Sequence, residues 1–338
     1  MADGISLDLI LMADDHQTVD SAAEQAQLAE SHGFETVSMG ETTGWNVVPV
    51  LAVLAERTDD IAIADDVLSP YARAPAVYGQ TALTMHDISD GRFRLGLGTS
   101  SPALAERWHS SSFDQPLRRL RETIDVIRAV YDGGSVTYDG EIFEMGGLDY
   151  SRQVPDDPPP VDVASLGPKA TELTGRFADG WVPQLFTTDA LADRMEDLEH
   201  GAELGDRSVE DVRVSPIVRT CIDEDPDRAR MLARQMVAFL IGAYGPFYGQ
   251  SVAEQGYAEE VAEIRDAWED RDTAAMADAL HDEMLESLAA VGTPEMVRER
   301  IEEYTSVESV DAVRVGFVSG MSQEDKERTL AELEPLTE

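Results

Sequence analysis

The stretch that decides the fold is SLGPKATELTGRFADGWVP, residues 165–183. The apolar run PVDVA precedes it, and a second apolar run begins at Gly180. Between them, Gly167 and Pro168 stand in front of a helical pattern. Proline suits the first position of a helix, where its missing N–H would have had no partner. The stretch therefore predicts a strand, a tight turn, a helix and a further strand.

The same alternation extends over most of the chain. Strand candidates lie at 5–12, 34–39, 61–69, 92–98, 160–167, 180–186, 211–222 and 311–320, each followed by a helical pattern. Eight such units in 338 residues predict an α/β protein with a (β/α)8 TIM-barrel fold. A doubly wound open sheet is the alternative, but it often has a glycine-rich first turn, and LILMADDHQT has no glycine.

Two segments interrupt this alternation. Residues 133–159 contain SVTYDGEIFEM, which predicts a hairpin with Asp139-Gly140 at its turn. Residues 226–304 show a long helical pattern. We therefore expect one barrel domain over 1–338, with insertions after strand four and between strands seven and eight.

The charge balance is strongly acidic. The chain has 67 Asp and Glu against 26 Lys and Arg, a net charge of −41, and the acids are scattered among core-type residues. This pattern predicts a folded protein of a halophile, whose self-repulsion is screened at high salt. It argues against nucleic-acid binding, since no basic stripe exists. No apolar run of about 18 residues and no signal-peptide pattern is present, so we expect a cytoplasmic protein without a membrane span.

Cysteine and histidine usage indicates neither disulfides nor a metal. Cys221 is the single cysteine, and we expect a buried thiol there. The six histidines show no spacing typical of a metal site.

The junction at residues 165–169 is a candidate phosphate site. Active sites of TIM barrels lie where strands end and helices begin. Ser165, Leu166, Gly167, Pro168 and Lys169 occupy such a junction. The free N–H groups of the following helix turn would attract an anion, Gly167 permits close approach, and Lys169 adds a charge. The alternative is an ordinary tight turn.

Three motifs identify a family. LGPKATELTGRFADGWVP, GRFRLGLGTSSP (91–102) and VLSPYARAPAVYGQTALTMHDISDGR (67–92) resemble the luciferase-like flavin and deazaflavin oxidoreductases. ESLAAVGTPEMVRERIEEY is also similar to that family, and the helical stretch around VAFLIGAYGPFYGQ most resembles its methylene-tetrahydromethanopterin reductase branch. That branch uses coenzyme F420, a deazaflavin.

The resemblance implies roles for particular residues. A non-prolyl cis peptide in strand three, which supports the ring in family members, corresponds to Asp66–Val67, although the family usually has glycine at the first position. Gly40-Glu41 stands where the reductases commonly have Asp-His, and Glu41 is our candidate proton donor or substrate clamp. Ile10 stands where the methanopterin reductases carry a glutamate, and we expect Asp8 to be out of register with it.

Further candidates line the other strand ends. Gly98 and Thr99 would leave room for a flat ring and bind its carbonyls, and Gln184 ends strand six. Weaker candidates are His109 and, at the end of strand seven, Thr220 and Cys221.

The function that the resemblance implies is F420-dependent hydride transfer to an electrophilic carbon of a small molecule, with a pterin or folate one-carbon carrier as the first substrate choice. The alternatives are an FMN-dependent monooxygenase and a non-catalytic flavin-binding barrel. Family members imply a homodimer or homotetramer, and residues 237–249 would face a partner, cover the pocket or form a core helix.

Overall fold

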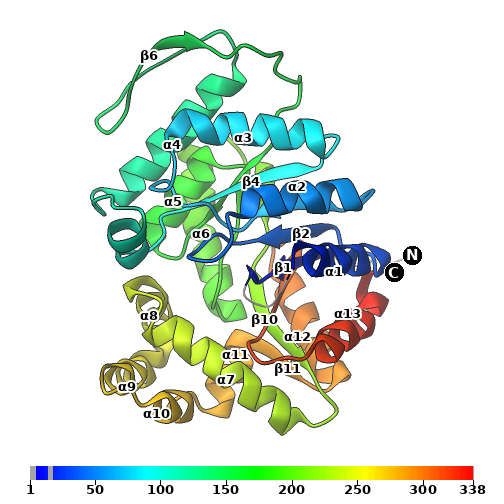
Figure 1. The fold of residues 1–338 in the computed structure, drawn as a ribbon. Coiled ribbons are helices and arrows are strands. Elements are labelled where there is room, and N and C mark those ends of the chain that lie inside the picture. Colours follow the sequence, from blue (N-terminus) through cyan, green and yellow to red (C-terminus); the bar gives the residue numbers. More distant parts are fainter. Residues whose placement is uncertain (1–4, 14–17, 338) are drawn as a thin grey trace.

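The computed structural model describes residues 5–13 and 18–337, and a curled sheet of parallel strands forms its centre (Figure 1). The strands lie side by side in the order β11-β10-β12-β1-β2-β3-β4-β7-β8-β9. Their bounds are β1 Leu7–Leu11, β2 Thr36–Met39, β3 Ala62–Asp65, β4 Phe93–Gly98, β7 Val161–Ala164, β8 Gly180–Trp181, β9 Arg213–Val214, β10 Ile217–Ile222, β11 Ala289–Gly292 and β12 Val313–Phe317.

The sheet closes into a barrel because β9 and β10 are successive parts of one strand. Only Ser215 and Pro216 separate them, and the hydrogen-bond ladder runs through this gap. Ser215 N donates to Trp181 O at 3.0 Å, and Ile217 N donates to Pro183 O at 2.8 Å. On the other side, β10 pairs with β12, which pairs with β1. With β9 and β10 taken together, the eight predicted strands form the ring, and the sequential order excludes a doubly wound sheet.

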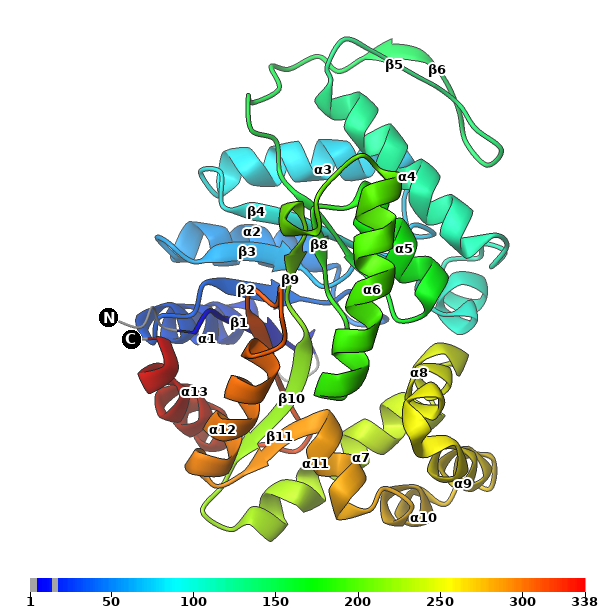
Figure 2. The ribbon, with the colours of Figure 1, turned by 180° about the vertical axis from the view of Figure 1, so that it is seen from behind.

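Helices surround this ring (Figures 1 and 2). Those that follow the barrel strands are α1 Val19–Ser31, α2 Val47–Arg57, α3 Pro75–Ile88, α4 Pro116–Tyr131, α5 Pro168–Phe177, α6 Thr188–Leu204, α7 Pro226–Gly242 and α13 Gln323–Thr337. None of the helices in the described part of the chain is long and apolar enough to cross a bilayer.

The alternation within β1 shows why this sequence forms a barrel strand. Leu7, Leu9 and Leu11 belong to the large hydrophobic cluster, whereas Ile10 belongs to a small separate cluster with residues of β10 and of the segment after β8. Because successive side chains of a strand point to opposite faces, the leucines pack against the helices while Asp8 and Ile10 point into the barrel. Asp8 thus shares a face with Ile10 but lies one layer away, so it does not occupy the position of Ile10.

The hairpin insertion is present where it was predicted. Strands β5 (Ser135–Asp139) and β6 (Glu144–Asp149) pair antiparallel. Gly140 N donates to Phe143 O at 2.9 Å, so the turn spans 140–143, slightly later than expected. In Figure 1 the hairpin projects at the top of the molecule, beyond α4.

The second insertion is not helical throughout. Its helices are α7, α8 (Pro246–Val252), α9 (Ala258–Glu269), α10 (Thr273–Asp278), α11 (Asp282–Leu288) and α12 (Pro294–Thr305), but the expected helical stretch 226–304 also contains β11. Strand β11 pairs parallel with β10 beyond the barrel ring. Its apolar run of four residues is too short for its periodicity to distinguish a buried strand from a buried helix. Only the pairing with β10 makes this segment a strand.

Candidate active site

The carboxyl end of the barrel has an apolar floor. Ile10, Val182 and Ile217 are nearly inaccessible to solvent and contact one another, and Ala164 packs against them. These residues come from β1, from the segment after β8, from β10 and from β7. Three strand ends and the first residue of β10 therefore provide one apolar cluster inside the barrel.

Glycines leave space around the end of β3. A Cβ atom added at Gly40 would lie 2.5 Å from Asp66 O, and one added at Gly98 would lie 2.6 Å from Val67 Cγ2. A side chain at either position would collide with the Asp66–Val67 segment, whose peptide bond is cis, as the resemblance implied. Thr99 follows directly and is partly exposed at the mouth.

The two aspartates at the end of β3 have different environments. Asp65 is buried and accepts a hydrogen bond from Leu68 N at 3.1 Å, and burial raises the pKa of its carboxyl well above the ordinary value. Asp66 accepts from Arg314 Nη1 at 2.6 Å and from Ser38 Oγ at 3.3 Å. Asp65 therefore supports the turn after β3, while Asp66 lies inside the barrel.

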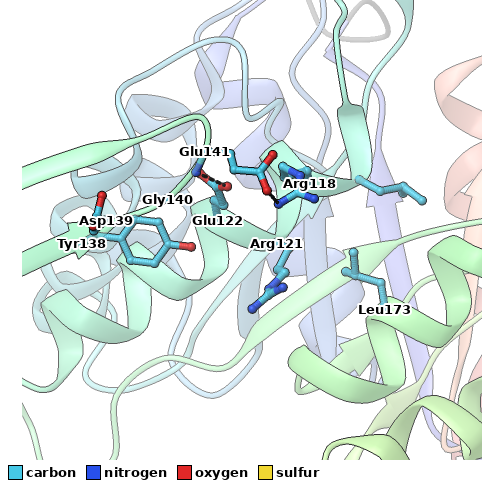
Figure 3. Close-up of a pocket in the computed structure, with 9 residues that line it drawn as sticks. Arg118, Arg121, Glu122, Tyr138, Asp139, Gly140, Glu141 and Leu173 are labelled. Carbon is cyan, nitrogen blue, oxygen red and sulfur yellow. Dashed lines mark hydrogen bonds and ion pairs between the residues drawn. The ribbon is translucent and has the colours of Figure 1, made fainter.

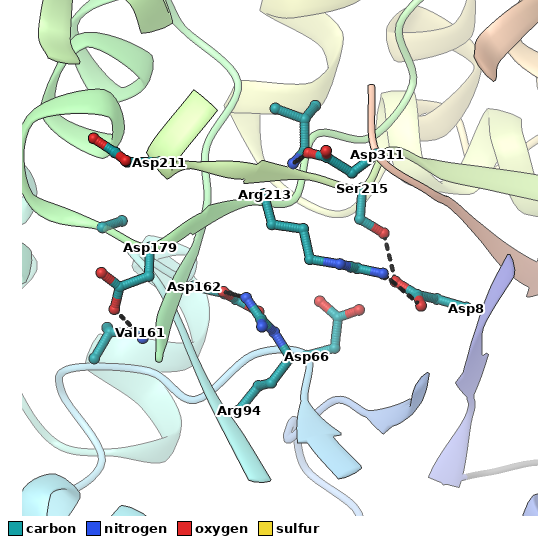
Figure 4. Close-up of polar contacts among 12 residues, drawn as sticks. Asp8, Asp66, Arg94, Val161, Asp162, Asp179, Asp211, Arg213, Ser215 and Asp311 are labelled. Carbon is teal, nitrogen blue, oxygen red and sulfur yellow. Dashed lines mark hydrogen bonds and ion pairs between the residues drawn. The ribbon is translucent and has the colours of Figure 1, made fainter. Parts of the chain in front are cut away.

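Charged side chains from several strands gather inside the barrel, among them Asp8, Arg213 and Asp66 (Figure 4). Asp8 accepts from Arg213 at 2.7 and 3.0 Å and from Ser215 Oγ at 2.7 Å, and Arg314 Nη2 lies 3.5 Å from it. Burial raises the pKa of Asp8, but the two arginines outweigh it and lower the pKa to about 2. Asp8 is therefore a permanently ionised structural group rather than a substitute for the glutamate that Ile10 replaces.

Glu41 follows β2 and forms a bidentate pair with Arg73. Its two carboxylate oxygens accept from Arg73 Nη1 and Nη2, each at 2.7 Å, and Oε2 also accepts from Val47 N at 3.1 Å. Both side chains are largely buried, with 10% of Glu41 and 16% of Arg73 exposed. The charges of this pair act on His109, whose pKa is lowered mainly by burial.

The 165–169 junction has the form of an uncapped helix start. Ser165 Oγ lies 2.9 Å from Thr174 Oγ1, and Ser165 O accepts from the Trp181 indole at 3.1 Å, which fixes the turn from inside. Gly167 caps α5 without a side-chain hydrogen bond, and an added Cβ there would meet open space. Pro168 is the first residue of α5, and Leu166 packs partly against the core. The side chain of Lys169 is 80% exposed and pairs with Glu172 at 3.3 Å.

Gln184 contacts an arginine that sequence reasoning did not single out. Arg219 of β10 is only 4% exposed, and its Nη1 lies 3.9 Å from Met12 Sδ at the mouth of the barrel. A guanidinium can only donate, so the Gln184 amide oxygen faces it and accepts from Nε at 2.8 Å and from Nη2 at 2.6 Å. The available signal was the alternation of IVRTCI, which places Arg219 on the same face as Ile217. Cys221 lies in the hydrophobic core, where burial raises its thiol pKa to about 12.

Helix α8 approaches the same face from the helical insertion. Tyr248 Oη lies 3.0 Å from the Gln184 amide, and Phe247 stacks near Phe113, with ring centroids 6.1 Å apart. Phe113 in turn stacks on Tyr71 at 5.4 Å. Of the three possibilities for residues 237–249, the structure thus supports a role in covering the site, while α7 contributes buried residues to the core.

Another cavity, of about 520 Å³, lies outside the barrel between α4, α5 and the hairpin (Figure 3). Arg118 and Arg121 line it, but Arg118 pairs with Glu141 at 2.6 Å, and Arg121 lies 3.4 Å from Asp125. None of its lining residues belongs to a barrel strand end, so it is separate from the candidate active site. Within residues 5–13 and 18–337, no group of three or more His, Cys, Asp or Glu side chains could hold a metal ion.

The fold defines a TIM-barrel protein, and the candidate site lies at the carboxyl ends of its strands, where TIM barrels carry their active sites. The family model described as luciferase-like monooxygenase matches residues 7–308. The chain belongs to this luciferase-like family.

Several relatives are named as reductases or dehydrogenases. The chain is 29% identical over 284 residues to the 5,10-methylenetetrahydromethanopterin reductase of Archaeoglobus fulgidus, covering 82% of this chain and 83% of the relative. It is 28% identical over 267 residues to the F420-dependent glucose-6-phosphate dehydrogenase of Nakamurella multipartita, covering 71% and 76%. The structure of the coenzyme F420-dependent tetrahydromethanopterin reductase of Methanopyrus kandleri superposes with a TM-score of 0.83 at 24% identity, over 98% and 97% of the chains.

Proposed function

We propose that this protein is an oxidoreductase that uses coenzyme F420 to transfer hydride between the reduced deazaflavin and an electrophilic carbon. The observation that carries the proposal is the apolar floor of Ile10, Val182 and Ile217, bordered by hydrogen-bonding groups at the strand ends. Such a surface fits one face of a planar ring with polar edges. The named F420-dependent relatives favour F420 over FMN.

We assign the cofactor's contacts to the strand ends around that floor. The uncapped start of α5, with Ser165, Leu166, Gly167, Pro168 and Lys169, would hold its phosphate, because free N–H groups and the helix dipole attract an anion. The open space at Gly167 allows close approach.

The ring would lie between the ends of β2, β3, β4 and β8. Gly40 and Gly98 place no side chain against the Asp66-Val67 segment, and this segment would support the ring from the end of β3. Thr99 and Gln184 supply hydrogen-bonding groups at the edge. When bound, reduced F420 supplies a hydride and reacts as a two-electron carrier.

Glu41 is the proposed proton-managing or substrate-clamping group. It lies at the carboxyl end of β2, and Arg73 and Val47 N fix the position of its carboxylate. A group held in this way contributes by orientation as well as by proton transfer. For substrate we propose a one-carbon carrier of the pterin or folate type, in line with the reductase relatives.

We further propose that residues 1–338 form one luciferase-like domain that acts in the cytoplasm on a small molecule and assembles as a homodimer or homotetramer. Light scattering on the protein eluting from a sizing column, in about 2 M KCl to screen its charge, measures the assembly directly. A monomer under these conditions would contradict this part of the proposal.

The first experiment is a fluorescence titration of the purified protein with F420 and with FMN, again in about 2 M KCl. Tight F420 binding with weak FMN binding supports the proposal, and reduction of 5,10-methylene-tetrahydromethanopterin or 5,10-methylene-tetrahydrofolate is then assayed. A preference for FMN would favour the monooxygenase alternative. F420 binding without turnover on any acceptor would favour the non-catalytic barrel.

A further inference from the structure

Three side chains at the barrel mouth form a chain of hydrogen bonds. The direction of these bonds shows that a tyrosine of the helical insertion has a hydroxyl hydrogen to donate. The chain starts at Arg219, passes through the Gln184 amide and ends at Tyr248 of α8. Arg219 fixes the amide oxygen of Gln184 toward itself, at 2.8 and 2.6 Å. The amide nitrogen must then donate to Tyr248 Oη, 3.0 Å away.

This direction determines what the Tyr248 hydroxyl does. A phenol oxygen that accepts from an amide still carries its own hydrogen, which is directed to another acceptor. Burial raises the pKa of Tyr248, so the phenol stays neutral and keeps that hydrogen at physiological pH.

The chain lies over the apolar floor. A Cβ atom added at Gly316 would lie 3.0 Å from Arg219 Nη1, 3.2 Å from Ile10 and 3.3 Å from Ile217. Strand pairing also aligns Ile10 and Arg219 with Gly316, so the guanidinium borders the floor residues. Tyr248 reaches the barrel mouth from α8 and contacts Gln184, which is a proposed edge contact of the ring, so its hydroxyl lies beside the proposed ring site.

We propose that Tyr248 is a substrate-binding residue that donates a hydrogen bond to a carbonyl oxygen or ring nitrogen of the hydride acceptor. Gln184 and Arg219 are positioning residues, since they fix which way the phenol donates. This inference rests on the proposed function, because the substrate must lie between the strand ends and α8. It adds a specificity residue from an insertion rather than from a barrel strand.

The test compares Tyr248→Phe with Tyr244→Phe. Tyr244 lies on the same segment, and its ring packs edge-on against Tyr248 at 5.8 Å, so it controls for loss of a nearby phenol without the Gln184 contact. We measure the F420 dissociation constant by fluorescence, the thermal unfolding midpoint, and kcat and KM with 5,10-methylene-tetrahydromethanopterin and 5,10-methylene-tetrahydrofolate as hydride acceptors.

The expected result for Tyr248→Phe is a fall in kcat/KM of about 10-fold or more, with the F420 dissociation constant and the unfolding midpoint unchanged. Tyr244→Phe should stay within about twofold of the parent in kcat/KM, the fold-change of a removed hydroxyl that makes no contact with substrate. Gln184→Leu should lower kcat/KM at least as much as Tyr248→Phe, and it should also weaken F420 binding, because Gln184 is a proposed contact of the cofactor as well. The double variant should be no worse than Gln184→Leu alone, because the Tyr248 contact acts through Gln184.

Three outcomes would overturn the inference. An unchanged kcat/KM in Tyr248→Phe excludes a substrate contact. A weakened F420 affinity in that variant would assign the phenol to the cofactor. A parent protein that binds F420 but reduces neither acceptor removes the substrate that Tyr248 would hold. If the parent does not bind F420, the proposed function itself fails, and this result is distinguishable from the other three.

Discussion

Glu41 and Arg73 face each other across two hydrogen bonds of 2.7 Å, between the loop after β2 and the loop after β3. The pair joins the first turn of α2, through Val47 N, to the segment that leads into α3. The pair can have either of two roles: Glu41 manages a proton in the reaction, or the pair only holds the two loops together.

Replacing Glu41 by Gln separates these roles. If Glu41 manages a proton, kcat should fall by about 100-fold or more, and the acidic limb of the pH profile of kcat/KM should disappear. Steady-state kinetics between about pH 5 and pH 9 measure both effects. Arg73→Lys, which keeps a charge but loses the bidentate geometry, should lower kcat while retaining the pH profile. Equal losses in both variants with an unaltered profile would make the pair purely structural.

Asp8→Asn should destabilise the protein by about 3–5 kcal/mol near neutral pH, because it removes a buried carboxylate from Arg213 and Arg314. The folded-state pKa of Asp8 is lowered from 3.8 to about 2, so its stabilisation is fully present above about pH 4. That stabilisation is lost as the pH falls toward 2.

Urea unfolding of the parent and of Asp8→Asn at constant high salt tests this prediction. The difference in unfolding free energy between them should shrink below about pH 4. A difference of the same size at acidic and neutral pH would show that the charge of Asp8 does not contribute.

Gly98→Ala and Gly167→Ala should differ in their effects. The new methyl group at position 98 would lie 2.6 Å from Val67 Cγ2, so we expect a loss of stability of about 1–3 kcal/mol together with weaker F420 binding. At position 167 the methyl group meets open space, so stability should change by about 1 kcal/mol or less.

The cofactor affinity of Gly167→Ala is the informative measurement. If a phosphate binds at the start of α5, the added methyl group should weaken F420 binding even though the fold is intact. Unaltered F420 affinity, measured by fluorescence titration, would mean that the 165–169 junction is only a tight turn.

Cys221 should be unreactive in the folded protein. It is fully buried, and burial raises its thiol pKa to about 12, so almost no thiolate exists at neutral pH. A maleimide should label it only after addition of denaturant, as mass spectrometry of the intact protein would show. Rapid labelling without denaturant would contradict the burial.

Salt should stabilise the protein. A net charge of −41 repels itself at low ionic strength, and the screening length falls to about 3 Å near 1 M salt. We expect the thermal unfolding midpoint to rise steadily between about 0.1 and 2 M KCl. A midpoint that is independent of KCl would argue against a halophilic adaptation.

The barrel itself could be predicted from the sequence because its signals are local. Alternating apolar residues in LDLIL and the Gly-Pro start of α5 each report on a few neighbouring residues, and together they specify strand–helix units in order. The order of those units then leaves a closed sequential ring as the preferred arrangement. Strand β11 was missed because its short apolar run carries no such local signal and depends on pairing with β10.

The candidate site depended on contacts between residues far apart in the chain. Glu41 was singled out from its place after β2, but its pairing with Arg73 is a tertiary contact. Arg219 and Tyr248 were not singled out, because the sequence does not show which strand or helix each would face.

The sequence by itself thus determined the strand–helix order, the acidic surface and the candidate positions at the strand ends, since these follow from periodicity, composition and local motifs. Only the tertiary structure decided that Asp8 is locked by Arg213 and Arg314, and that Arg219 orients Gln184 toward Tyr248. The physical reason is that a charge or a hydrogen-bond donor acquires its role from the partner that faces it. In this barrel, that partner comes from a different strand or from the helical insertion.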